Sequence, residues 1–290
     1  MFYHDGKLQY EVKVDKPNPQ FAKMLQQAIG GIEGEMRVCL QYLFQAWGSR
    51  GPEKYRDMLL DTGTEEIAHI EMLATAVAKN LDGASSDIQE EMANKNPAVE
   101  AVLGGKDPRH ILSSGLSAMA VDSNGVPFNG SWIVGSGNIA ADMYANVMAE
   151  STGRLLATRL WKSTDDAGMK DMLSFLIARD TMHQNQWLAV LEELGGFKGN
   201  HPIPNSFPQH KENDDFNYNF ISTNIHKDSK AKGRWSQGKS IDQKGNFTFD
   251  DAQPHGQKPH LGKPDPAGFA QKSQMDGSGS VIEKVKDKLT

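Results

Sequence analysis

Four acidic residues interrupt the apolar stripes of the long helical patterns in this sequence, one on each pattern. They are Glu35, Glu66, Glu150 and Asp180. Two of them are followed three residues later by a histidine, in the pairs Glu66-x-x-His69 and Asp180-x-x-His183. Side chains three positions apart on a helix lie side by side, so each pair can offer one oxygen and one nitrogen to the same point. Burial of an unpaired carboxylate costs several kcal/mol, and these stripes therefore need a compensating positive charge.

A pair of divalent cations would supply that charge if the helices bring the side chains together. Four carboxylates and two imidazoles cannot stay ionised and unpaired in a low dielectric. The oxygen-rich donor set suits manganese or iron better than a metal that favours sulfur or a tetrahedral site. A lone glutamate on two helices, with an acid three residues before a histidine on the other two, is typical of dinuclear carboxylate bundles. The sequence therefore predicts a dinuclear metal site.

Structural ion pairing is the alternative interpretation of the same acids. Arg154 or Arg179 could pair with the acids of the last two helical patterns, and no metal would then be needed. An acid at the matching face of four separate helices favours the metal site over this alternative. Glu65 and Glu71 lie beside the candidate ligands, and we expect both to be solvated surface acids.

The helices that must position these residues are visible as four periodic stretches, at 19–48, 52–80, 138–163 and 166–194. Asn18 and Pro19 suit the start of the first stretch, and two glycines end the last one. Short links within each pair of stretches predict two antiparallel hairpins. The residues between the hairpins, 81–137, lack sustained periodicity and would form a long crossover. We therefore predict an all-α core, a ferritin-like four-helix bundle.

Composition changes sharply at Gly195–Gly196, where Pro, Gly, Asn and Lys become frequent. We place a four-helix-bundle dimetal domain at 1–195 and an extended, mostly irregular tail at 196–290. The tail spaces aromatic residues along its length, namely Phe207, Phe216, Tyr218, Phe220, Trp235, Phe247, Phe249 and Phe269. A disordered tail would contain few aromatic residues, so we expect this one to lie across a neighbouring subunit. A flexible tail with scattered aromatic residues is the alternative.

Charge and cysteine content exclude several classes of function. The 290 residues include 31 basic and 37 acidic ones, for a formal charge of −6, and no basic cluster is dense enough to follow a phosphate backbone. We expect no nucleic-acid partner. No apolar run reaches about 18 residues and the first residues lack a signal-peptide pattern, so we expect neither membrane insertion nor ordinary export. The single cysteine, Cys39, favours a reducing compartment, the cytoplasm.

Several stretches of the chain resemble the non-haem manganese catalases. They are GGIEGE at 30–35, EKYRDMLLDTGTEEIAHIEM at 53–72, SGNIAADM at 136–143 and FLIARDTMHQ at 175–184. The resemblance covers essentially the first 195 residues, with a weaker match in the tail at GKPDP. The long second stretch is the most specific of these matches.

The resemblance implies a ferritin-like enzyme that disproportionates hydrogen peroxide to water and dioxygen at two manganese ions. By that resemblance Glu66 bridges the ions. Glu35 and His69 would complete one ion, and Glu150 and His183 the other. The activity needs a centre that gives and takes two electrons without releasing radicals, which two manganese ions acting together can do.

Two further residues would serve the reaction without binding metal. Asp180 is our candidate acid and base for the protons of peroxide, and Tyr42 matches a family tyrosine that forms a hydrogen bond near the metals. The sequence departs from the family pattern twice here. Asp180 is one methylene shorter than the usual glutamate, and Ala149 stands where a relative can carry arginine.

The family also suggests an assembly and a second metal. The resemblance implies a homohexamer. Some members hold a calcium ion between one subunit and the tail of its neighbour, for which the candidate residues here are Asp57, Asp61, Asn219 and Ser222. Two solvated acids on the helix surface are the alternative interpretation of Asp57 and Asp61.

Two other functions remain open from the sequence. A di-iron carboxylate oxidase or ferroxidase would use nearly the same ligands. A structural protein of the spore coat could keep the catalase fold, and the chain would then lie in the spore coat rather than act in the cytoplasm. The complete ligand set argues against such an inactive scaffold.

Overall fold

The computed structural model describes residues 4, 6–84, 108–204 and 207–262. Two compact units divide the chain. The first comprises Met1–Tyr218 together with Gly238–Asn246, and the second comprises Asn219–Gln237 together with Phe247–Thr290.

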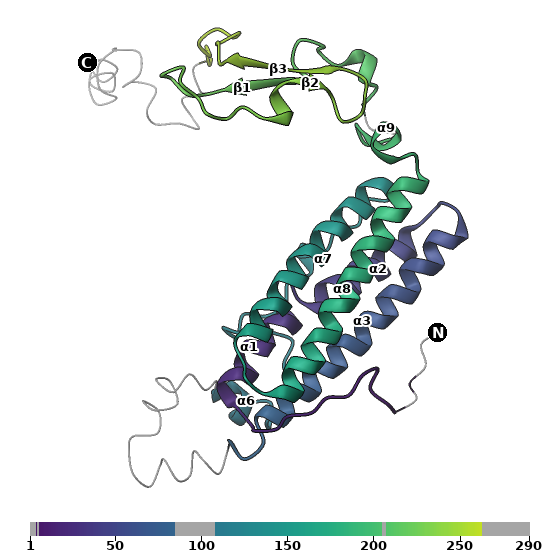
Figure 1. Ribbon diagram of the computed structural model, residues 1–290, viewed down its shortest axis with the longest axis vertical. Coiled ribbons are helices and arrows are strands. Elements are labelled where there is room, and N and C mark those ends of the chain that lie inside the picture. Colours follow the sequence, from purple (N-terminus) through teal and green to yellow (C-terminus); the bar gives the residue numbers. More distant parts are fainter. Residues whose placement is uncertain (1–3, 5, 85–107, 205–206, 263–290) are drawn as a thin grey trace, which may run out of the picture. The chain divides into compact units, whose positions relative to one another are not determined.

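The first unit is built on four long helices (Figure 1). They are α2 (Glu35–Gly48), α3 (Glu53–Asn80), α7 (Ile139–Lys162) and α8 (Ala167–Glu193). Helix α2 packs along α3 and α7 packs along α8, and contacts of α2 with α7 and of α3 with α8 join the two hairpins. The short link within each hairpin makes its two helices antiparallel. This arrangement confirms the predicted ferritin-like four-helix bundle.

The predicted helix over 19–48 is divided in the structure. Helix α1 (Pro19–Gly30) ends at a glycine turn, and α2 begins at Glu35. At Gly34 a Cβ would lie 2.7 Å from the carbonyl oxygen of Ile29, so only glycine fits this reversal of the chain. The break makes Glu35 the first residue of α2, which fixes the direction in which its carboxylate leaves the backbone.

The other long helices lie within one residue of the predicted stretches at each end. Asn138 caps α7 by accepting hydrogen bonds from the backbone N–H groups of Ala140 and Ala141, and Asp166 caps α8 through that of Met169. Such caps satisfy N–H groups that have no partner within the helix.

The crossover between the hairpins packs against the bundle where the structure describes it. Its regular elements are α6 (Pro108–Leu112), the 3₁₀ turn η1 (Gly130–Trp132) and a bridge between Val121 and Pro127. The buried amide of Gln26 on α1 donates to the carbonyl oxygens of Met119, at 2.6 Å, and Val121, at 2.8 Å. Residues 85–107 of the predicted crossover lie outside the described residues.

Two apolar clusters form the core, and a polar layer lies between them. One cluster contains Leu59 of α3 and Trp187 of α8. The other contains Leu73 of α3 and Leu176 of α8. Glu66 lies midway between the two leucines of α3. The candidate ligands therefore occupy one level of the bundle, sealed by apolar side chains on both sides.

The segment after the bundle contains more regular structure than its sequence suggests. Its helical turns are α9 (Gly196–Asn200), η2 (Gln209–Lys211) and η3 (Arg234–Ser236), and its strands are β1 (Asn219–Ser222), β2 (Gly238–Lys239) and β3 (Asn246–Asp251). Strands β1 and β3 pair in parallel, with the rings of Phe220 and Phe249 stacked 5.6 Å apart. Phe269 and the end of the GKPDP match lie outside the described residues. No helix of the described chain is long and apolar enough to cross a membrane.

Candidate metal centre

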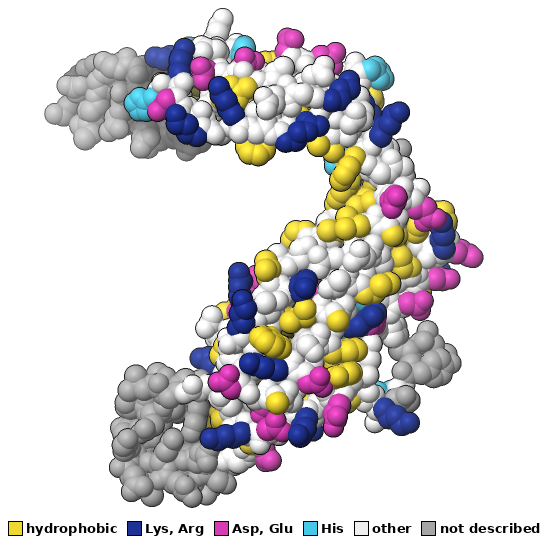
Figure 2. Space-filling model, in the orientation of Figure 1, with side chains coloured by type: hydrophobic (Ala, Val, Ile, Leu, Met, Phe, Trp, Pro, Cys, Tyr) yellow, Lys and Arg dark blue, Asp and Glu magenta, His cyan; other side chains and the backbone are white. Residues whose placement is uncertain are grey.

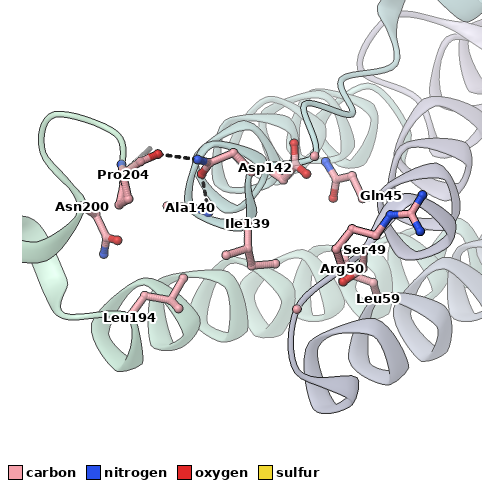
Figure 3. A pocket seen from close by; sticks show the side chains of 13 residues that line it. Gln45, Ser49, Arg50, Leu59, Ile139, Ala140, Asp142, Leu194, Asn200 and Pro204 are labelled. Carbon is pink, nitrogen blue, oxygen red and sulfur yellow. Dashed lines mark hydrogen bonds between the residues drawn. The ribbon is translucent and has the colours of Figure 1, made fainter. Parts of the chain in front are cut away.

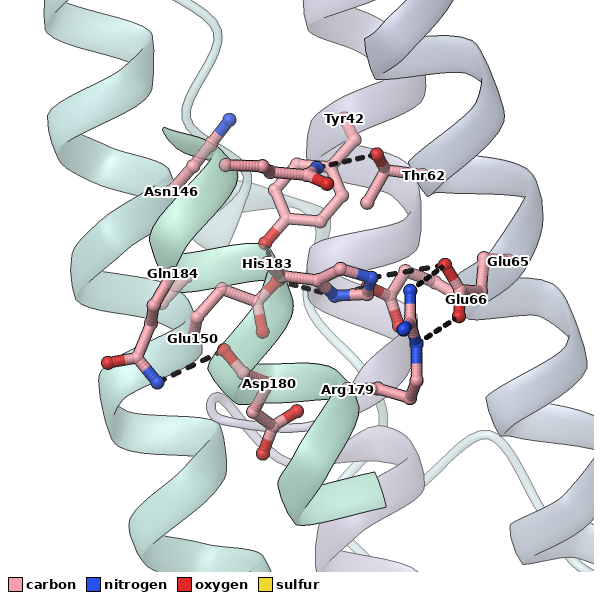
Figure 4. Close-up of polar contacts among 12 residues, drawn as sticks. Tyr42, Thr62, Glu65, Glu66, Asn146, Glu150, Arg179, Asp180, His183 and Gln184 are labelled. Carbon is pink, nitrogen blue, oxygen red and sulfur yellow. Dashed lines mark hydrogen bonds and ion pairs between the residues drawn. The ribbon is translucent and has the colours of Figure 1, made fainter. Parts of the chain in front are cut away.

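The bundle brings to the polar layer all six acids and histidines that interrupt the apolar stripes of the sequence. Glu35 comes from α2, Glu66 and His69 from α3, Glu150 from α7, and Asp180 and His183 from α8. Figure 4 shows Glu66, Glu150 and His183 converging from three helices, with Asp180 one level away. Except for Glu35, which is partly buried, every one of these residues is at most 5% exposed. Four acids on separate helices therefore share one enclosed space.

Two ligand triads meet at Glu66. One is Glu35, Glu66 and His69, and the other is Glu66, Glu150 and His183; within each, the possible ligand atoms lie within 4.8 Å of one another. The two oxygens of Glu66 face different histidines. Oε2 lies 2.6 Å from Nδ1 of His69, and Oε1 lies 3.0 Å from Nδ1 of His183. A carboxylate with this orientation can serve both triads at once.

The donor set fits divalent cations. Glu66 Oε1 and His183 Nδ1 are both buried and have no hydrogen-bond partner in the described part of the chain. Although they are close together, their orientation is not that of a hydrogen bond. Unpaired buried donors and acceptors are costly, and a cation between these atoms would remove the cost. Carboxylate and imidazole donors suit manganese or iron.

The pKa values show how strongly the metal-free layer is charged. Burial and the neighbouring Glu66 raise the pKa of Glu35 to about 7. Burial would also raise the pKa of Glu66, but its two histidines hold it at about 2. The carboxylates in turn raise the pKa of His183 to about 12 in spite of burial. Without metal, protons must neutralise the layer, and cations can replace those protons.

Asp180 lies beside the triads rather than in them. Its carboxylate forms no hydrogen bond with any described residue, and it lines a cavity of about 10 Å³ together with Glu35, Glu150, Ala149 and Gly153. That volume is close to what one water molecule requires. Burial, followed by the charges of the nearby glutamates, raises the pKa of Asp180 to about 9. The group thus keeps its proton at neutral pH in the metal-free protein.

Tyr42 holds one of the candidate ligands. Its hydroxyl donates a short hydrogen bond to Glu150 Oε1, and its ring packs against Trp187 with 4.9 Å between ring centroids. Burial and the charge of Glu150 raise the pKa of Tyr42 well above its usual value, so the hydroxyl stays a donor. The tyrosine therefore lies beside the predicted metal site.

Glu65 is the residue of this layer that sequence reasoning misplaced. The prediction of a solvated acid is wrong, because the Glu65 side chain is only 19% exposed and contacts both candidate histidines. Its partner Arg179 donates to it from α8 at 2.6 and 3.1 Å, so Arg179 is not the partner of Asp180 or Glu150. Glu71, at 40% exposure, does lie at the surface. In the sequence, Glu65 directly precedes Glu66 and Arg179 directly precedes Asp180. This adjacency to candidate residues is the signal that could have placed them near the site.

The candidate calcium residues are split between the two units. Asp57 and Asp61 are exposed on α3 of the first unit. Asn219 and Ser222 begin and end β1 in the second unit, where Asn219 donates to Asp250 at 2.9 Å.

A larger pocket is shown in Figure 3. It measures about 360 Å³ and is lined by residues near the end of the bundle, among them Arg50, Asn138, Asp142, Asn200 and Pro204. The Asn138 amide donates to the carbonyl oxygen of Pro204 at 2.6 Å. This pocket contains none of the predicted metal or catalytic residues.

Known proteins resemble this chain over most of its length. The sequence profile of the family described as manganese containing catalase matches residues 1–285. A manganese catalase of Bacillus subtilis is 48% identical over 266 residues, which cover 92% of this chain and 96% of that protein. A manganese catalase of Lactiplantibacillus plantarum is 44% identical over 194 residues, or 67% of this chain and 72% of that one.

The fold has a close counterpart among solved structures. The crystal structure of KatB, a manganese catalase from Anabaena PCC7120, superposes with a TM-score of 0.65 and covers 86% of this chain and 98% of that one. At 22% sequence identity, this likeness concerns the fold alone.

Proposed function

This chain belongs to the manganese-containing catalase family, and we propose that its two triads hold the two manganese ions at which it disproportionates hydrogen peroxide. The reaction converts two molecules of peroxide to two of water and one of dioxygen. One observation carries the assignment of the site. The carboxylate of Glu66 presents one oxygen to each triad, and the buried atoms Glu66 Oε1 and His183 Nδ1 have no hydrogen-bond partner among the described residues.

Each ion would have its own pair of ligands in addition to the shared one. Glu35 and His69 would hold the first, and Glu150 and His183 the second. A bound pair of manganese ions supplies a two-electron exchange with peroxide. Tyr42 supports this arrangement, because its hydrogen bond fixes the orientation of Glu150 within the apolar core.

Asp180 is suited to move the protons of the reaction. It lines a small cavity together with the candidate ligands Glu35 and Glu150. A carboxyl group without a hydrogen-bond partner in the described chain is free to donate a proton to an oxygen there and to take one back. Ala149 and Gly153 leave this space open, and Arg179 is already bound to Glu65. We therefore assign proton transfer to Asp180.

Family membership favours this function over the two alternatives. The di-iron oxidase differs mainly in the metal, and metal analysis of protein purified without added metal distinguishes it. A structural protein would not need the complete set of buried ligands. The buried, free thiol of Cys39 supports the reducing cytoplasm as the proposed compartment.

We expect the intact protein to be a homohexamer. Hydrophobic side chains gather on the bundle face shown in Figure 2, over α7 and α8. The exposed ones on these helices include Met148, Leu155, Met182 and Leu188. Light scattering should give six times the 31.9 kDa mass of the chain. Leu155, 54% exposed, would lie in a contact between subunits, so Leu155→Asp should lower that mass. A monomeric wild type would disprove the assembly.

The calcium site remains a prediction that involves a second subunit. Asp57 and Asp61 would supply carboxylate oxygens, and Asn219 and Ser222 of a neighbour would complete the site with the oxygen donors that calcium prefers. Chelation selective for calcium should then reduce the oligomer size or lower the thermal midpoint. If both are unchanged while bound calcium is removed, the site does not hold the assembly together.

A further inference from the structure

Glu65 and Glu66, consecutive acids of α3, flank the two candidate histidines on opposite sides. Glu66 lies on the Nδ1 side of both rings. Glu65 lies on the Nε2 side, with Oε2 3.1 Å from Nε2 of His183 and Oε1 3.6 Å from Nε2 of His69. The two rings are nearly parallel, at 26°, with centroids 6.0 Å apart. One carboxylate can therefore act on both imidazoles from the side away from the triads.

The Glu65 carboxylate is itself held in place from two other segments. Arg179 donates through Nε and Nη2 to its two oxygens, and Gln9 donates to Oε1 at 2.8 Å. The two hydrogen bonds from the Arg179 guanidinium favour the ionised form of this carboxylate. Two parallel hydrogen bonds from one guanidinium hold the carboxylate in a fixed orientation as well as stabilising its charge.

An ionised carboxylate only accepts hydrogen bonds, and this limits what the imidazoles can do. A neutral histidine carries one ring proton, on either Nδ1 or Nε2. Facing Glu65, each ring is favoured with its proton on Nε2, which leaves the Nδ1 lone pair directed at the triads. Only that form can bind a metal ion through Nδ1.

We propose that Glu65 is a positioning residue that keeps both His69 and His183 in the Nε2–H form, and so makes each Nδ1 available to one manganese ion. The inference rests on the metal assignment made above. Glu65 lies outside both triads, but each of its oxygens faces one histidine. A change at Glu65 would therefore affect both metal positions.

Glu65→Gln tests this directly. An amide has one acceptor oxygen and one NH₂ donor, so one of the two histidines must face a donor. That ring would accept at Nε2 and carry its proton on Nδ1, where it blocks the metal. We expect manganese to fall from two ions toward one per chain, with affinity at the affected position reduced about 10- to 100-fold. The electron paramagnetic resonance spectrum should change from that of a coupled pair to that of isolated Mn(II).

Glu71→Gln is the matched control. It makes the same change on the same helix, at a carboxylate that lies at the surface and contacts His4 at 3.3 Å. This variant should keep two manganese ions and the coupled spectrum. Failure of wild type to bind two ions would contradict the proposed function, whereas normal wild type together with a fully loaded Glu65→Gln would contradict only the role of Glu65.

Glu65→Asp separates positioning from a merely structural role. Aspartate keeps two ionised acceptor oxygens, although it reaches less far, so this variant should hold more manganese than Glu65→Gln. Equal loss in the two variants would overturn the proposal. If Glu65→Gln does not fold, Arg179→Gln takes its place: the loosened carboxylate should release manganese to a chelator faster than wild type, and an unchanged rate would contradict the inference.

Discussion

Replacing Glu66 with alanine is expected to remove both manganese ions and to reduce peroxide-dependent oxygen evolution to background. The residue belongs to both triads and faces a different histidine with each oxygen. Without it, each triad keeps one carboxylate and one imidazole, and two divalent cations would repel each other with no shared anion between them. Elemental analysis and an oxygen electrode, applied to the same purified variant, measure both losses.

Glu71→Ala is the control for this experiment, since it removes a carboxylate from the surface of the same helix. It should retain wild-type metal and activity. Two manganese ions per chain in Glu66→Ala would show that Glu66 does not bridge them, and the ligand assignment would then be wrong.

Replacing Asp180 with asparagine should leave both ions in place and reduce the rate by about 10²- to 10⁴-fold. The side chain lines the cavity beside Glu35 and Glu150 but belongs to neither triad, so metal loading does not depend on it. Asp171→Asn, an exposed change on the same helix, should retain the full rate. A metal-free Asp180→Asn variant would instead make Asp180 a ligand.

The same variant should change how the stability of the metal-free protein depends on pH. The folded-state pKa of Asp180 is raised to about 9 from a usual value of 3.8. Between those values the folded chain keeps a proton that the unfolded chain releases, so stability falls as pH rises through this window. Thermal melts should show metal-free Asp180→Asn to be more stable than metal-free wild type at pH 8. The difference should disappear near pH 4. An equal difference at both pH values would contradict the raised pKa.

The ligand residues could be predicted because they violate a local pattern. A charge on an apolar stripe is visible in one helix alone, and the three-residue spacing of Glu66 and His69 adds a second local signal. The break after Gly30 was missed because only part of its cause is local: the close approach at Gly34 is to Ile29, whereas that at Gly30 is to a distant segment. A Cβ at Gly30 would meet the backbone of Val121, which approaches from the crossover far along the chain.

Glu65 illustrates the same limit within the site. At the edge of the apolar stripe it resembles any surface glutamate, and its partners Arg179 and Gln9 come from α8 and from the N-terminal segment. Only the packed bundle brings them together. The strands of the tail were missed for a related reason: β1 spans four residues, too few for a clear alternating pattern, and its pairing with β3 is fixed by tertiary contact.

Metal content and oxygen evolution measured on one sample of the intact protein test the central claim most directly. Protein purified from cells supplied with manganese should contain two manganese ions per chain and release one molecule of dioxygen for every two of peroxide consumed. Removing the metal should abolish the release, and adding manganese back should restore it. Iron in place of manganese, or a fully manganese-loaded protein that evolves no dioxygen, would contradict the account.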